Sequence, residues 1–139
     1  MNKARWICMA AAAATALAAC SPPKPGTAVE FGSVCDKVGE RVMVTGFPVL
    51  PDTIEGDTVN LWIYESAPYE GEVIEAVLSI GDGANQVGDV IDQFGDEDLK
   101  VTAGDGKTVY SFGESAKFSG DVKEGGTTGA CTITNVLVE

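Results

Sequence analysis

Hydrophobic and polar residues alternate along most of the chain after residue 40, which is the two-residue period of β-strands. The pattern predicts seven strands, at residues 41–47, 59–64, 73–80, 99–103, 107–112, 117–122 and 132–138. Between the third and fourth strands the period becomes helical over residues 87–94, where apolar residues recur at Val87, Val90, Ile91 and Phe94. The chain is therefore predicted to be mainly β, with one short helix.

Glycines indicate where these strands turn or bend. Gly104-Asp105-Gly106 separates two of them, and an Asp-Gly pair supplies the positive backbone dihedrals of a tight hairpin. The segments 39–46 and 113–120 share the pattern Gly-Glu-x-x-x-hydrophobic-hydroxyl-Gly. Two copies do not make a repeat protein. A glycine late in a strand instead permits the bulge or bend that lets a small sheet curl into a barrel.

Three strands, a short helix and two or more further strands is the element order of the OB-fold. The phrases R-V-M-V-T-G-F at 41–47, K-F-S-G-D-V at 117–122 and C-T-I-T-N-V-L-V at the end resemble small envelope OB-fold domains of bacteria. The resemblance covers residues 31–139 and implies a small OB-fold-like barrel, to which the hairpin around Asp105 is an addition. An immunoglobulin-like β-sandwich is the alternative, but the mid-chain helix counts against it.

The first residues have the order of an export signal, with Lys3 and Arg5 ahead of an apolar run over residues 6–19. The run ends in Leu17-Ala18-Ala19-Cys20, which resembles the lipobox of bacterial lipoproteins. In that family residues 1–19 are removed, and Cys20 receives a diacylglycerol and an acyl chain. An ordinary secretory signal or an uncleaved membrane helix is the alternative. The run over residues 6–19 is short for a membrane helix, because about 20 apolar residues are needed to span the hydrocarbon.

The resemblance implies a protein held by lipid on the extracytoplasmic side of the cell envelope. Ser21, where an aspartate would favour inner-membrane retention, favours the outer membrane if the cell is Gram-negative. Residues 20–30 contain three prolines and are predicted to be an acylated, extended tether ahead of one domain at 31–139. The expected partner is therefore the membrane, through the lipid on Cys20, together with a possible envelope protein.

The mature chain is strongly acidic. Loss of Lys3 and Arg5 leaves seven basic residues against 21 acidic ones, a net charge of −14. Because Lys and Arg supply most of the affinity for phosphates, nucleic acid is not an expected partner. The acidic stretch of Asp89, Asp92, Asp96, Glu97 and Asp98 is a candidate calcium site, but its spacing is not that of an EF-hand, and a solvated loop explains it more simply.

Two cysteines remain beyond Cys20, and an even pair in an exported protein predicts a disulfide between Cys35 and Cys131. The chain has no histidine, so it has no imidazole base and no zinc or copper site completed by histidine. Nothing in the sequence places two carboxylates across a cleft for acid–base chemistry. We therefore expect no enzymatic activity, no metal and no cofactor.

Two functions of different kinds remain. The first is a non-enzymatic interaction module that binds an envelope protein. The alternative is a small-ligand or glycan-binding module that uses aromatic residues on one barrel face, for which Trp62, Tyr64 and Tyr110 are the candidates, with Tyr69 and Phe112 as further rings. Aromatic residues in strands more often pack in the core, so exposure of these rings in the structure would favour the alternative.

Overall fold

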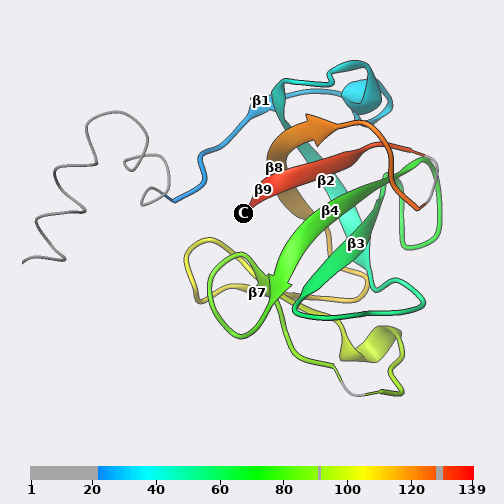
Figure 1. Ribbon diagram of the computed structural model, residues 1–139, viewed down its shortest axis with the longest axis vertical. Helices are drawn as coiled ribbons and strands as arrows, with labels where there is room; N and C mark the ends of the chain where they lie inside the picture. Colours follow the sequence, from blue (N-terminus) through cyan, green and yellow to red (C-terminus); the bar gives the residue numbers. More distant parts are fainter. Residues whose placement is uncertain (1–21, 91, 128–129) are drawn as a thin grey trace, which may run out of the picture.

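The computed structural model describes residues 22–90, 92–127 and 130–139. The chain forms a closed barrel of five strands, namely β2 (Arg41–Val49), β3 (Thr58–Tyr64), β4 (Val73–Ile80), β8 (Ala116–Lys123) and β9 (Thr132–Val138) (Figure 1). Strand β2 pairs antiparallel with β3 and β8, β3 with β4, and β8 with β9. Parallel pairing of β4 with β9 closes the barrel. This order confirms the OB-fold-like barrel, and a two-sheet sandwich does not form.

Alternation along the strands separates the core from the outer surface. In β3 the side chains of Val59, Leu61 and Ile63 are buried, and Asn60 and Trp62 between them face outward. Each of the other barrel strands also supplies apolar residues to one continuous core, with Phe118 among the largest fully buried side chains. A single core is the expected result for a chain of this length. The same alternation places polar and aromatic residues on the outside of the barrel.

The additional hairpin lies outside the five barrel strands and consists of β6 (Lys100–Thr102) and β7 (Val109–Ser111). Asp105 shapes its turn by accepting hydrogen bonds from the Thr108 hydroxyl and from the backbone N–H groups of Lys107 and Thr108. These donors lower the pKa of the Asp105 carboxyl to about 2.

All seven predicted strands are confirmed, and their observed ends differ from the predicted ends by at most two residues.

The helix predicted over residues 87–94 is wrong. Val87 belongs to β5 (Gln86–Val87), a short strand between β4 and β6, and the described residues from 88 to 95 are irregular. The Gly88 N–H donates to the Lys100 carbonyl instead of forming a helical turn. Val87, Val90 and Phe94 pack against the core from an extended path, which satisfies the same apolar spacing. One 3₁₀ turn follows directly, η2 (Asp96–Asp98).

Gly120 confirms the predicted use of a glycine late in a strand. The register between β8 and β9 shifts between Ser119 and Asp121, so Gly120 lies at a bulge. A Cβ atom there would be 2.7 Å from the Cβ of Ile133 and 3.0 Å from the Thr134 carbonyl oxygen. Any larger residue would push β9 away at the place where the barrel curves.

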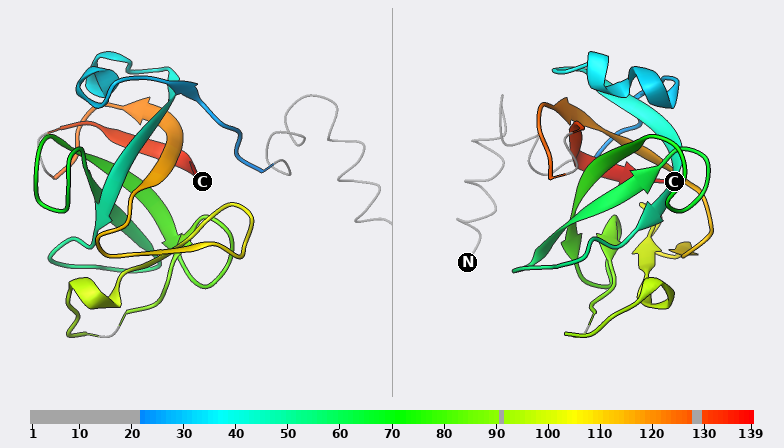
Figure 2. Two further views of the ribbon diagram at one scale, coloured as in Figure 1. Left: turned by 180° about the vertical axis from the view of Figure 1, so that it is seen from behind. Right: turned by 90° about the vertical axis from the view of Figure 1, so that its right-hand side faces the viewer.

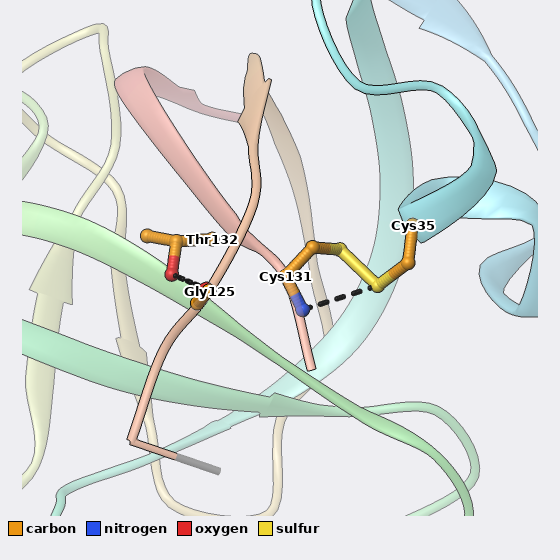
Figure 3. The surroundings of a disulfide bond; sticks show 4 residues. All are labelled: Cys35, Gly125, Cys131 and Thr132. Carbon is orange, nitrogen blue, oxygen red and sulfur yellow. Dashed lines mark hydrogen bonds between the residues drawn. A yellow bond between two sulfur atoms is a disulfide. The ribbon is translucent and has the colours of Figure 1, made fainter. Parts of the chain in front are cut away.

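The predicted disulfide between Cys35 and Cys131 is present (Figure 3). Cys35 lies in a 3₁₀ helix, η1 (Phe31–Asp36), and Cys131 directly precedes β9; their Cα atoms are 5.3 Å apart. The Cys131 N–H also donates to the Cys35 sulfur at 3.2 Å. The bond thus joins the segment ahead of the first barrel strand to the last barrel strand, across 96 positions of sequence.

Residues 24–29, which we call the strap, are bound to the barrel. Thr27 and Ala28 form β1 (Thr27–Ala28), which pairs in parallel with β2. The Arg41 Nε donates to the Lys24 carbonyl at 2.7 Å, and the Gly26 N–H donates to the Ser119 hydroxyl oxygen at 3.0 Å. Only glycine fits at position 26, where a Cβ would overlap the Val42 backbone. Residues 24–29, part of the segment predicted to be an extended tether, are therefore bound along the barrel.

Residues 1–19, with the expected signal, and Cys20 lie outside the described residues. Within the described part of the chain, no helix is long and apolar enough to cross a membrane.

Candidate functional site

An open groove of about 760 Å³ lies on the outer face of β3. We call it the β3 groove. Its floor is formed by outward-facing residues of β3, and its walls come from the β2–β3 loop (residues 50–57) and from Thr127 in the described part of the β8–β9 loop (residues 124–127). The residues that characterise it are Asp52, Glu55, Asn60, Trp62, Tyr64 and Thr127. Two loops that are far apart in sequence therefore meet across one strand.

Trp62 and Tyr64 lie in the groove because the alternation of β3 sends Leu61 and Ile63 to the core and their neighbours outward. Both aromatic side chains are half-buried, so each keeps part of its ring surface accessible. The indole N–H of Trp62 is buried and has no hydrogen-bond acceptor. A buried donor without a partner costs about 1–3 kcal/mol, which a partner supplied from outside would recover.

Glu75 supports the groove from β4, where it is paired in register with Trp62. Its side chain is 0% exposed although it faces outward, because the β8–β9 loop covers it. The Asn60 amide donates to one carboxylate oxygen at 3.0 Å, and the Thr127 hydroxyl donates to the other at 3.2 Å. Gly126 allows this approach, since a Cβ there would lie 2.5 Å from the carboxylate. One buried carboxylate thus links the floor of the groove to one of its walls.

A second contact shapes the same loop. The Thr132 hydroxyl donates to the Gly125 carbonyl at 2.7 Å, close to the disulfide (Figure 3). The β8–β9 loop is therefore held both by Glu75 and at the start of β9. Sequence reasoning missed Glu75, Asn60 and Thr127. The available signal was a single acidic residue inside the strongly apolar strand 73–80.

An aromatic cluster of Tyr64, Tyr69 and Phe112 continues from the groove. The ring centroids of Tyr64 and Tyr69 are 5.6 Å apart, and those of Tyr69 and Phe112 are 6.2 Å apart. The Tyr69 hydroxyl donates to Asp96 at 2.7 Å. That hydrogen bond, with partial burial and the charge of Asp96, raises the pKa of Tyr69 to about 12.

Tyr110 does not join Trp62 and Tyr64. It lies in β7, paired with Val101, and lines a separate hollow of about 320 Å³ with Gly104 and Leu137. The strand pattern could not show this separation, because it gives no information on which outward faces are adjacent in the barrel. Of the three predicted aromatic residues, the structure therefore brings only Trp62 and Tyr64 together.

The acidic stretch is divided among different contacts. Asp96 accepts from Tyr69, and Asp98 accepts from the Gly95 N–H at 2.8 Å. Asp89 and Asp92 line a small hollow with Asp52. Across the described ranges, no three or more carboxylate, cysteine or histidine side chains are grouped to hold a metal ion. In the same ranges, the residues lining the β3 groove include Asp52 and Glu55 and no lysine or arginine.

Comparison with known proteins adds no family. No protein-family model, no curated protein and no solved structure matches the chain.

Proposed function

We propose that the protein is a non-enzymatic, lipid-anchored protein of the cell envelope that binds a glycan or similar small ligand in the β3 groove. The observation that carries this proposal is the half-buried pair of Trp62 and Tyr64 on an open barrel face between two loops. OB-fold barrels bind oligosaccharides and oligonucleotides on the corresponding face, between the corresponding loops. The structure thus favours the second of the two functions expected from the sequence.

The charge of the groove supports a neutral ligand. Asp52 and Glu55 are its charged lining residues among those described, and the mature chain carries −14 overall. A phosphate backbone would be repelled by this charge, which excludes oligonucleotides from the proposal. A neutral sugar needs no counter-charge and stacks on an aromatic ring through its apolar face. Its hydroxyl groups also provide acceptors that would suit the unpartnered Trp62 N–H once the groove walls adjust.

Trp62 offers a direct experiment, because it is the only tryptophan beyond residue 19. Its fluorescence should change when neutral oligosaccharides are titrated into the mature protein. Trp62→Ala should weaken binding about tenfold or more, since it removes the ring contact, worth on the order of 1.4 kcal/mol. Calorimetry measures the variant affinities. Trp62→Phe should retain part of the affinity and be nearly neutral for stability, because it removes a donor without an acceptor.

Tyr110→Ala is the matched control, since this ring lies outside the β3 groove. It should leave the affinity unchanged. Equal affinities for wild type and Trp62→Ala would overturn the groove as the binding site, and so would a panel of neutral oligosaccharides that binds nowhere on the protein.

The anchor is the second part of the proposal, and it is supported by the lipobox resemblance at residues 17–20 and by a disulfide of the kind found in exported proteins. Two or more acyl chains make attachment stable, because each buried methylene contributes about 0.8 kcal/mol. Cys20→Ala should therefore move the protein out of the membrane fraction and abolish incorporation of labelled palmitate. Membrane fractionation identical to wild type would contradict acylation at Cys20.

A protein partner is the second candidate function. Tyr69 favours it, because this ring is 53% exposed and lies at a positive φ of 65°, an unusual conformation for a bulky residue. Crosslinking of the native protein in intact cells, compared with the Cys20→Ala variant, decides between the two functions. A stoichiometric partner found only with the anchored protein supports an adaptor, and its absence leaves the ligand-binding function.

A further inference from the structure

We propose that the barrel turns the outer face of β2 and β8, together with the strap, toward an anionic lipid layer, so that the β3 groove faces away from the membrane. This inference rests on the proposed acylation of Cys20. It concerns the orientation of the domain, which the anchor alone does not set.

The strap shortens the connection to the membrane. Residues 24–29 are held by the Arg41 and Ser119 hydrogen bonds, by the pairing of β1 with β2, and by a Val29 N–H bond to the Met43 carbonyl at 3.1 Å. Only three residues then lie between Cys20 and the first bound position, Lys24, so four Cα-to-Cα steps connect them. At no more than about 3.6 Å per residue they span roughly 14 Å, and Pro22 and Pro23 stiffen them. The domain therefore cannot move far from the lipid surface.

The strap and β3 contact opposite ends of β2. The strap pairs with Val42 and Met43, near the start of this strand, and β3 pairs with residues 47–49, at its end. In Figure 1 the chain leaves the barrel on the left and β3 lies on the right; Figure 2, left, shows the same separation from behind. A membrane at the free end of the strap is therefore on the far side of the barrel from the groove.

Basic and acidic residues are also distributed unevenly between the strap side and the groove side of the barrel. Five of the seven basic residues beyond residue 19 lie in residues 24–41 and 117–123. On the outer face of β2 and β8, Arg41 and Asp121 form an ion pair at 3.2 Å, so their opposite charges neutralise each other. The exposed side chains of Lys24, Lys117 and Lys123 then remain, together with the carboxylates of Glu40, Glu124 and Glu139 at the strand ends. Glu30 and Asp36 lie in the segment between the strap and β2, so the charges on this side are mixed.

The groove side has no such lysines. No lysine or arginine occurs between Arg41 and Lys100, whereas this stretch contains 13 acidic residues, including those of the groove walls. An anionic lipid surface attracts nearby lysines and repels carboxylates within about a Debye length. Because the whole domain is acidic, it would not bind lipid by charge alone. Once tethered, it is turned by its charge asymmetry.

The experiment uses the mature acylated protein, purified from membranes and inserted into nanodiscs that contain phosphatidylglycerol and a gadolinium-bearing lipid. Paramagnetic broadening of the backbone amide signals reports the distance of each strand from the headgroups. The strongest broadening is expected in the strap, β2 and β8, and the weakest in β3 and the β2–β3 loop. The triple variant Lys24→Gln/Lys117→Gln/Lys123→Gln should lose most of this contrast, as should high salt.

The double variant Lys100→Gln/Lys107→Gln is the matched control. It also removes lysines, but not from the β2–β8 face, and should keep the contrast. Equal broadening of β8 and β3, or stronger broadening of β3, in a protein that stays on the nanodiscs would overturn the orientation and leave the anchor intact. A protein that is not acylated or does not insert would overturn the anchor, and the orientation with it.

Discussion

The double variant Cys35→Ala/Cys131→Ala is expected to lower the free energy of unfolding by about 4–5 kcal/mol. The bond closes a loop with a sequence separation of 96 residues, so its removal frees a large part of the unfolded chain. Cys131 is only 3% exposed, and its loss also leaves a small void beside β9. For a domain of this size the melting temperature should fall by roughly 15–25 °C. Urea and thermal denaturation measure both quantities.

Reduction supplies the control for this variant. Treating the wild-type protein with a phosphine reductant should lower its melting temperature close to that of the double variant, whereas the variant itself should not respond. The alanine pair is preferable to a single substitution, which would leave a free thiol. A loss below about 1 kcal/mol would mean that the barrel needs no cross-link between η1 and β9, contrary to the loop-closure argument.

Glu75→Ala is the second change with a large expected effect, on stability and on the groove together. It removes the acceptor of the Asn60 amide and the Thr127 hydroxyl and leaves a void under the β8–β9 loop. We expect a loss of about 2–3 kcal/mol in the free energy of unfolding. The loop should also lose its hold on β4, so the Gly126 and Thr127 amides should exchange faster and the Trp62 emission should shift to the red as water enters.

Glu75→Gln tests whether hydrogen bonds or charge carry this effect. Its amide oxygen can accept from Asn60, and its amide nitrogen can donate to the Thr127 hydroxyl oxygen, so the loss should be clearly smaller than for alanine. Ser79→Ala, at an exposed outward position of the same strand, should leave stability within about 0.5 kcal/mol of wild type. An alanine variant of Glu75 with unchanged stability and unchanged loop exchange would remove Glu75 from the support of the groove.

The failed helix at 87–94 shows the limit of periodicity as a signal. Apolar residues at helical spacing predict burial of those residues, and Val87, Val90 and Phe94 do pack on the core. The backbone conformation was decided instead by pairing partners, because β4 and β6 offer free edges on both sides of residues 86–87. A short segment beside two strand edges gains more from joining the sheet than from a two-turn helix, which is marginal by itself.

The candidate site likewise separates what a sequence pattern predicts from what the tertiary structure decides. Strand alternation in the sequence places Trp62 and Tyr64 on the face opposite Leu61 and Ile63, and the structure confirms that placement. It also placed Tyr110 among the candidates, although β7 carries this residue to another hollow. Alternation assigns a residue to one side of its own strand, but it does not say which other strand or loop lies next to that side.

The sequence by itself determined the seven strands longer than two residues, the cysteine pair, the barrel class and the bend at Gly120, because alternation, strand order and turn chemistry are local properties. Only the tertiary structure decided that Glu75 is buried and that the strap is bound. Each of these features depends on residues far apart in the chain, such as Thr127 with Glu75 and Ser119 with Gly26. Closure of the barrel brings these segments into contact, and the free energy of such contacts exists only after the chain has closed around its core.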